Sequence, residues 1–321
     1  MGEKMIRVGL VGAGSIAKIA ELPALSAEPG VKIAGVVTTH TAEETIKRLE
    51  RWPIERAYDT AAEMIAEANL DALFVLTPKQ FHATYVEMGL KAGLDVFCEK
   101  PPTTSLDDAR YLAGLAEETG KILMIGFNRR YAEVYVRARQ QFKQGEVRLC
   151  VAQKNRPGSE YRATLENSIH MVDLMRWFCG EAEEVTAHAI APDPFYEEGT
   201  MALIRFSTGV LGALVAARCS GEWDERFDVY GNLTSVRVTA PDSVAITREG
   251  ETRLIEMRPR AMGWAEVNKT MGFGPEVTHF IECVRTRKQP LTHIGDALRT
   301  QELMYEILGQ AGLPLTDNGK K

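Results

Sequence analysis

The sequence predicts an α/β protein of two domains: a doubly wound parallel sheet, then an α+β domain with a large open, mainly antiparallel sheet. In the first part of the chain, short apolar runs alternate with helical patterns, as in parallel strands joined by crossover helices. From about residue 146, short strand-like runs follow one another across turn residues, which is typical of antiparallel strands. A chain of 321 residues also exceeds one average domain. We expect domains at 1–126 and 127–321.

The first domain opens on an apolar run that breaks into a glycine-rich turn, IRVGLVGAGS at residues 6–15. Further strands are expected at 31–37, 72–76, 96–98 and 122–125, and helices at 60–68, 83–92 and 106–118. Ser105, with Asp108 three residues later, resembles a capping box at the start of the last of these helices.

The second domain is expected to consist mostly of strands. They are predicted at 147–152, 185–190, 201–206, 210–217, 227–230, 235–239, 244–247 and 253–257. One long helix at 165–179 interrupts the early part of this sheet, and others follow at 276–286 and 296–308.

The glycine-rich turn indicates a dinucleotide site. Gly12 and Gly14 lie between a buried strand and a predicted helix, and Ala17 completes the pattern Gly-x-Gly-x-x-Ala. Such a turn brings backbone amides, including those of Ser15 and Ile16, close to a pyrophosphate. The alternative is a plain tight turn, because the glycine pattern alone also occurs by chance.

The end of the second predicted strand bears on the choice between NAD and NADP. An acidic residue there would accept hydrogen bonds from the adenosine ribose and repel a 2′-phosphate. This chain has Thr38, Thr39 and His40 instead, with Lys47 and Arg48 further on. The sequence therefore favours NADP over NAD, although no arginine lies directly beside the strand end.

Lys100 is the first candidate for chemistry. It follows Glu99 where a predicted parallel strand ends, and ligands of open parallel sheets bind at the carboxyl ends of the strands. From that position Lys100 could orient a substrate oxygen. The alternative is an ordinary solvated lysine at a strand end.

Glu166, His170 and Asp173 form the second candidate, because their spacing of i, i+4 and i+7 places them on one face of a helix. A carboxylate on each side of an imidazole can fix its tautomer and raise its basicity, as a general base requires. The alternative is that the two acids pair with arginines such as Arg162 and Arg176, and that the histidine takes no part.

Other charged side chains point less clearly to a function. Arg129 and Arg130 follow a predicted strand and either meet an anionic ligand or belong to a solvated hinge. The histidines outside the helix show no metal-ligand spacing, so no metal site is expected.

Charge and cysteine content narrow the class of protein. A formal net charge of -6 argues against binding to nucleic acid or to an anionic membrane surface, and favours a small-molecule substrate. Five scattered cysteines without a Cys-x-x-Cys pair suggest a reducing compartment. With no apolar leader and no long apolar stretch, the sequence predicts a cytoplasmic protein.

Taken together, the motifs resemble those of the glucose-fructose oxidoreductase/inositol dehydrogenase (Gfo/Idh/MocA) family. The matching elements are Gly12-x-Gly14-x-x-Ala17, Thr77-Pro78 followed by His82, Glu99-Lys100-Pro101, Gly126-Phe-Asn-Arg129-Arg130, and His170-x-x-Asp173. Their order and spacing extend over nearly the whole chain. The resemblance implies an NAD(P)-binding Rossmann domain followed by a domain that binds substrate and supports oligomerisation.

The resemblance also implies roles for individual residues. Lys100 would contact nicotinamide and substrate, and His170 would accept the substrate proton. Asp173 would bind substrate hydroxyls, whereas Glu166 stands where inositol dehydrogenase-like members have a shorter Asp, so its substrate role is open. The cofactor-binding set comprises Gly12, Gly14, Ser15, Ile16, Ala17, Thr38, Thr39, His40, Thr77, Pro78, His82, Glu99 and Lys100.

The expected activity is hydride transfer between nicotinamide and a secondary hydroxyl or carbonyl of a sugar, cyclitol or related polyol. One alternative is a glycosidase-type enzyme that uses NAD transiently, although the glycine-histidine loop of such relatives is not evident. Another is a non-catalytic nucleotide-sensing regulator, which would tend to lose the lysine and histidine kept in this chain. The open sheet is expected to support a homodimer or homotetramer.

Overall fold

The computed structural model describes residues 4–158, 162–193, 195–257 and 267–316. The chain divides into two compact units: unit 1 comprises Met1–Asn128 and Glu266–Leu298, and unit 2 comprises Arg129–Ala265 and Arg299–Lys321. The sequence placed 266–298 with the second domain, whereas this segment belongs to unit 1. Helical periodicity identifies the apolar face of a helix but does not tell which sheet that face covers.

Unit 1 is a doubly wound parallel sheet, as the sequence predicts. Six strands lie in the order β3-β2-β1-β4-β5-β6, and every ladder between them is parallel. The strands are β1 (Ile6–Val11), β2 (Val31–Val37), β3 (Ala57–Tyr58), β4 (Ala72–Val75), β5 (Asp95–Glu99) and β6 (Leu123–Gly126).

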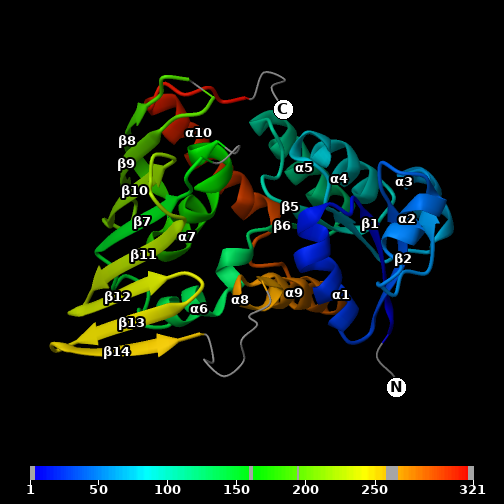
Figure 1. Ribbon diagram of the computed structural model, residues 1–321, viewed down its shortest axis with the longest axis horizontal. Helices are drawn as coiled ribbons and strands as arrows, with labels where there is room; N and C mark the ends of the chain where they lie inside the picture. The colour runs from blue at the N-terminus through cyan, green and yellow to red at the C-terminus, as the bar shows by residue number, and fades with distance from the viewer. Residues whose placement is uncertain (1–3, 159–161, 194, 258–266, 317–321) are drawn as a thin grey trace. The chain divides into compact units, whose positions relative to one another are not determined.

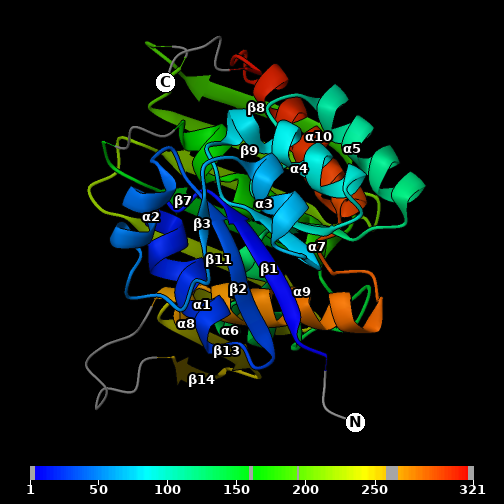
Figure 2. The same cartoon turned by 90° about the vertical axis from the view of Figure 1, so that its right-hand side faces the viewer.

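Helices cover both faces of this sheet, with α3, α4 and α5 on one face and α1 with α9 on the other (Figures 1 and 2). The helical segments of unit 1 are η1 (Ala17–Glu21), α1 (Leu22–Ala27), α2 (Ala42–Arg48), α3 (Ala61–Glu67), η2 (Lys79–Phe81), α4 (His82–Lys91), α5 (Leu106–Thr119), α8 (Val267–Thr270) and α9 (Phe273–Thr286). Complete capping boxes start α2 and α3, and the Ser105 hydroxyl accepts a hydrogen bond from the Asp108 amide at the start of α5.

Aromatic packing explains why the late segment returns to unit 1. The Phe280 ring of α9 lies 5.3 Å from the Phe74 ring of β4 and 5.7 Å from the Phe97 ring of β5, centroid to centroid, and all three side chains are fully buried. Edge-to-face pairs of this kind stabilise the folded state beyond the contribution of burying the rings. Helix α9 therefore completes the core of unit 1.

Unit 2 contains the large open sheet expected from the sequence. Eight strands lie in the order β14-β13-β12-β11-β7-β10-β9-β8, and only the β7–β10 ladder is parallel. They are β7 (Leu149–Asn155), β8 (Ala182–Ile190), β9 (Gly199–Phe206), β10 (Leu211–Ala217), β11 (Asp224–Gly231), β12 (Thr234–Thr239), β13 (Ser243–Arg248) and β14 (Glu251–Glu256).

The helices of unit 2 pack on one face of its sheet (Figure 1). They are α6 (Glu133–Arg139), η4 (Ala163–Asn167) and α7 (Ile169–Cys179); η3 (Asn128–Tyr131) and α10 (Ile294–Gln310) cross the boundaries between the units. The helix predicted at 165–179 is in fact two segments, because 163–167 form a wider π-helical turn before α7. None of the described helices combines the length and the apolar character that a membrane crossing requires.

Candidate active site

The glycine-rich turn lies at the carboxyl edge of the unit 1 sheet, the edge where β1, β2, β4 and β5 end. The Gly12 amide donates a hydrogen bond to the Val37 carbonyl at 2.8 Å, and Gly12 has a φ of +95°. A Cβ atom at Gly12 would lie 2.6 Å from the Leu76 carbonyl oxygen, so a larger residue would both strain the backbone and clash. Gly12 therefore allows the end of β1 to lie close to the end of β4.

The other side of this turn is open. A Cβ atom at Gly14 would meet nothing within 4 Å, and Ser15 and Ile16 are exposed at the start of the helix that continues through η1 and α1. The sheet order reverses between β1 and β4, which is the switch point where open α/β sheets bind nucleotides. Free backbone amides at a helix start beside an unfilled surface suit a pyrophosphate.

The end of β2 carries hydroxyl groups where many dinucleotide sites carry a carboxylate. The Thr38 and Thr45 hydroxyls are hydrogen-bonded at 2.6 Å, and the His40 amide donates to the Thr38 hydroxyl at 3.1 Å. Glu44 takes part in the capping box at the start of α2. Thr39 is exposed at this corner.

Lys100 lies at the same carboxyl edge, directly after β5. It is half-buried, and its backbone amide donates a hydrogen bond to the Glu99 carboxylate at 3.1 Å. Because β5 is separated from β1 only by β4, the lysine and the glycine-rich turn follow strands of one sheet at one edge. This is the placement that the sequence led us to expect for Lys100.

His82 begins helix α4, and its ring contacts the protein's own backbone. Nδ1 lies 2.8 Å from the Pro101 carbonyl oxygen, and Nε2 lies 2.9 Å from the Thr77 carbonyl oxygen. Both ring nitrogens are thus engaged within unit 1. Residues 77–78 link β4 to η2, so His82 joins this connection to the segment that carries Lys100.

In unit 2, the helix face expected to join Glu166 and His170 is altered by the π-helical turn. The Glu166 carboxylate accepts a hydrogen bond from the Arg162 amide at 2.9 Å, across the start of its own segment. His170 is buried in the first turn of α7. Glu166 therefore serves as a local cap, a role that a period of 3.6 residues does not reveal.

Asp173 is fully buried and bound by side chains of unit 2. Arg130 donates two hydrogen bonds to its carboxylate, from Nε at 2.8 Å and from a terminal nitrogen at 2.6 Å, and the Thr300 hydroxyl donates a third at 3.1 Å. Arg176 in turn donates to the Thr300 hydroxyl at 2.8 Å. These contacts account for Asp173 structurally, and its binding of substrate hydroxyls stays a prediction.

A second buried ion-pair cluster was missed by the sequence analysis. Arg129 contacts the Glu225 carboxylate through two hydrogen bonds of 2.9 and 3.0 Å, Tyr135 donates to it at 2.7 Å, and Lys154 forms a further ion pair. Burial alone would raise the pKa of Glu225, but the charges of Arg129 and Lys154 outweigh burial and hold it well below its ordinary value. Neither arginine of the 129–130 pair is a solvated hinge residue.

Strand alternation was the signal that could have revealed this cluster. Lys154 lies on the same buried face of β7 as Cys150 and Ala152. Glu225 lies on the same buried face of β11 as Phe227. Lys154 and Glu225 are also register partners across the two strands. Opposite charges at two inward, facing positions predict a buried pair.

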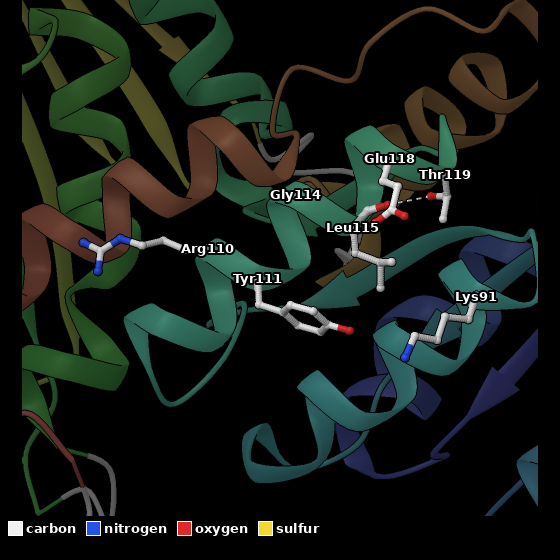
Figure 3. Close-up of a pocket in the computed structure, with 7 residues that line it drawn as sticks. All are labelled: Lys91, Arg110, Tyr111, Gly114, Leu115, Glu118 and Thr119. Atoms are coloured by element: carbon white, nitrogen blue, oxygen red, sulfur yellow. Dashed lines mark hydrogen bonds between the residues drawn. The ribbon is translucent and has the colours of Figure 1, made fainter.

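An open hollow of about 610 Å³ lies elsewhere, on the outer surface of α4 and α5. Its lining residues are Lys91, Arg110, Tyr111, Gly114, Leu115, Glu118 and Thr119 (Figure 3). None of the residues predicted for the active site contributes to it. In the part of the chain that the structure describes, no three His, Cys, Asp or Glu side chains gather closely enough to hold a metal ion.

Comparison with known proteins identifies relatives over nearly the whole chain. Residues 6–127 match an oxidoreductase family with an NAD-binding Rossmann fold (GFO_IDH_MocA), and residues 134–237 match the GFO/IDH/MocA C-terminal domain. The chain is 25% identical to scyllo-inositol 2-dehydrogenase (NAD(+)) of Bacillus subtilis (strain 168) over 319 residues, covering 92% of this chain and 91% of that protein.

Two further relatives agree with this assignment. Myo-inositol 2-dehydrogenase of Thermotoga maritima is 26% identical over 247 residues, covering 71% of this chain and 73% of that protein. The crystal structure of an oxidoreductase from Agrobacterium radiobacter in complex with NAD+, L-tartaric acid and magnesium has the same fold, with a TM-score of 0.86 at 20% identity, covering 96% of this chain and 97% of that one. The chain therefore belongs to the GFO/IDH/MocA family and is an oxidoreductase with an NAD-binding Rossmann domain.

Proposed function

We propose that the enzyme transfers hydride between a nicotinamide cofactor and a secondary hydroxyl or carbonyl of a sugar, cyclitol or related polyol. The observation that carries this proposal is the carboxyl edge of unit 1, where the open glycine-rich turn and Lys100 follow strands of one parallel sheet. The names of the relatives support the substrate class, since several are inositol dehydrogenases.

Unit 1 would bind the cofactor, and unit 2 would bind the substrate. Residues Gly12, Gly14, Ser15, Ile16 and Ala17 would contact the pyrophosphate, and Thr77, Pro78 and Glu99 would line the edge near the nicotinamide. When bound, the nicotinamide supplies the hydride acceptor or donor.

His170 would accept the proton of the substrate hydroxyl, and Lys100 would stabilise the negative charge that develops on the oxygen. A lysine that follows a strand at the ligand-binding edge is suited to such a contact. In this proposal Asp173 would bind substrate hydroxyls, and Glu166, whose carboxylate accepts a hydrogen bond from the Arg162 amide, is a second candidate for that role.

The cofactor form follows from the end of β2. We propose that NADP is accepted at least as well as NAD, because the end of β2 carries Thr38, Thr39 and His40 in place of an acidic residue; the Glu44 carboxylate lies 4.0 Å from the His40 ring. Fluorescence titration with NADH and NADPH tests this directly. At least equal affinity for NADPH supports the proposal, and a preference for NADH of tenfold or more contradicts it.

The activity itself is tested with myo-inositol, scyllo-inositol and a panel of aldoses and sugar acids, by following nicotinamide absorbance. We expect oxidation of at least one secondary alcohol, lost in Lys100→Met and kept in Lys91→Met, which removes an exposed lysine of α4. Net hydrolysis of a glycoside without redox change would instead favour the transient-redox alternative. Tight nucleotide binding with no turnover on the panel would favour a regulator.

We also propose that a second copy of the chain covers the open face of the unit 2 sheet. Met201 and Leu203 of β9 are 62% and 65% exposed. Leu211 of the neighbouring strand β10 is also exposed, as is its register partner Leu149 of β7. This apolar strip crosses three neighbouring strands, and a patch of this kind is suited to burial against an identical patch.

Light scattering of Leu203→Glu tests this interface. We expect the wild-type chain to be a dimer or tetramer and Leu203→Glu to have a lower mass, because a buried unpaired charge is costly. Leu233→Glu is the matched control, since Leu233 is 94% exposed in the turn between β11 and β12. A monomeric wild-type chain would contradict the proposal.

We place the enzyme in the cytoplasm, as its thiols suggest. Cys150 and Cys179 are buried, and the Cys179 thiol donates a hydrogen bond to the Cys150 sulfur at 3.4 Å, so an oxidising compartment would favour a disulfide between them. Alkylation of freshly lysed cells followed by peptide mass spectrometry should find both as thiols, and a native Cys150–Cys179 disulfide would contradict this location.

A further inference from the structure

His82 has an unusual pair of partners. Its side chain is 1% exposed, and its two ring nitrogens lie within hydrogen-bond distance of two carbonyl oxygens, those of Thr77 and Pro101. A carbonyl oxygen can only accept a hydrogen bond. A neutral imidazole has one N–H, so it can satisfy one of these carbonyls, whereas an imidazolium can donate to both.

The two carbonyls belong to segments that matter for the proposed chemistry. Thr77 lies just after β4, and Pro101 follows Lys100 just after β5. Strands β4 and β5 are neighbours in the sheet, so His82 bridges two successive loops at the carboxyl edge. The bridge reaches the backbone one residue beyond the lysine.

We propose that His82 is a positioning residue for Lys100: when its ring carries both protons, it donates a hydrogen bond to each carbonyl and thereby fixes the Lys100 segment against the loop after β4. His82 and both of the carbonyls that it contacts belong to unit 1. Its consequence for catalysis rests on the role of Lys100 in the proposed function.

The surroundings of the ring set the pH range of this bridge. Burial lowers the pKa of His82, the two carbonyls raise it, and the charges of Lys100 and Lys79 lower it, with a net downward shift. The other titratable side chains of α4 and of the elements packed against it are Tyr85, Glu87, Lys91, Glu63, Glu67, Asp95, Cys98, Glu99, Asp107, Asp108, Arg110, Tyr111, Glu117 and Glu118. Since the pKa is lowered, the ring gains its second proton on the acid side of its ordinary range, and the bridge loses one hydrogen bond as the pH rises.

The protonation state of the ring can be measured without any substrate. Nitrogen-15 NMR of protein labelled at its six histidines should show one ring, absent in His82→Gln, whose two nitrogens both become protonated as the pH is lowered. Both N–H protons of that ring should exchange slowly with water. A His82 ring that keeps one unprotonated nitrogen at every pH at which the protein is folded would overturn the proposal.

A second measurement follows Lys100 itself. The rate of acetylation of Lys100 relative to Lys91, read by peptide mass spectrometry, should rise across the titration of His82 as the pH increases. In His82→Gln this ratio should be higher by about fivefold on the acid side, the factor expected for one lost hydrogen bond, and should not change with pH. A wild-type ratio that is flat with pH would overturn the proposal, and this result does not depend on the folding of any variant.

These outcomes are distinguishable from failure of the proposed function, because neither readout requires turnover. If the enzyme oxidises myo-inositol, His82→Gln should also lower kcat and change the pH profile of kcat. An unchanged kcat and an unchanged pH profile in His82→Gln would contradict a positioning role.

Discussion

The carboxyl edge of unit 1 and the interior of unit 2 use polar residues in different ways. At the carboxyl edge of unit 1, the glycine-rich turn is open and Lys100 is half-buried. In unit 2, the charges of Asp173 and Glu225 are buried and paired with Arg130, and with Arg129 and Lys154, respectively. Unit 1 thus leaves backbone amides available to a ligand, whereas unit 2 uses its acids to organise its own interior.

This difference shows why a motif residue is not automatically a ligand-binding residue. Lys100 and Asp173 belong to equally prominent motifs, but only the lysine lies at an open edge. The Asp173 carboxylate accepts three hydrogen bonds from its own unit, and its binding of substrate hydroxyls stays a prediction. The predictions below, in order of decreasing effect, test this contrast.

The largest expected effect is on turnover. His170→Ala should lower kcat by roughly 100- to 10,000-fold, the usual contribution of a general acid or base, because it removes the group proposed to accept the substrate proton. The Kd for NADPH should stay unchanged, since the nucleotide contacts proposed above lie in unit 1. Normal turnover in this variant would remove His170 from the mechanism.

The next effect is on stability. Glu225→Ala should lower the free energy of unfolding by about 3–5 kcal/mol, because it leaves Arg129 and Lys154 buried without their counter-ion. Urea denaturation followed by circular dichroism measures this difference. Glu184→Ala, which removes an exposed partner of Arg205, is the control and should change stability far less. Equal effects in the two variants would contradict the contrast between buried and exposed pairs.

Two substitutions in the glycine-rich turn should have different effects, one on the stability of the fold and the other on nucleotide binding. Gly12→Ala should cost about 1–3 kcal/mol, because of its positive φ and the contact with the Leu76 carbonyl. Gly14→Ala should cost little stability, because the added methyl group meets no protein atom, but it should weaken NADPH binding. Thermal unfolding and nucleotide titration of both variants make the test. A Gly14→Ala variant with unchanged affinity would place the pyrophosphate elsewhere.

The smallest effect concerns pH. Since the pKa of Glu225 is lowered in the folded state, its contribution to stability is complete above the ordinary value of about 4.5 and decreases as the pH falls below that value. Between pH 5 and pH 3, wild-type protein should therefore lose more stability than Glu225→Gln. Parallel losses in the two proteins would show that Glu225 titrates normally.

Much of the fold could be predicted from the sequence because its signals are local. The alternation of strands and helices in unit 1 follows from the hydrophobic periodicity of each segment and from the turn residues between segments. The series of short strands in unit 2 follows from the same two signals. The return of α9 to unit 1 could not be predicted, because it depends on the Phe74, Phe97 and Phe280 rings meeting across about 200 residues.

The candidate site was predictable to a similar extent. Gly12 and Lys100 lie where the motifs imply, because a strand end fixes their place. Glu166 lies in a π-helical turn before α7, which the expected period of 3.6 residues does not reveal. The partners of Asp173 are distant in sequence, so no local pattern around this acid reveals them, whereas the strand alternation of β7 and β11 indicates the Lys154–Glu225 pair.

The most direct test of the central claim is calorimetric titration of the wild-type chain and Gly14→Val with NADPH and NADH. If the open turn at the carboxyl edge of unit 1 holds the pyrophosphate, the wild-type chain binds one dinucleotide per chain, and Gly14→Val binds at least tenfold more weakly while unfolding at the same temperature. No binding by the wild-type chain, or equal binding by both proteins, would contradict the account.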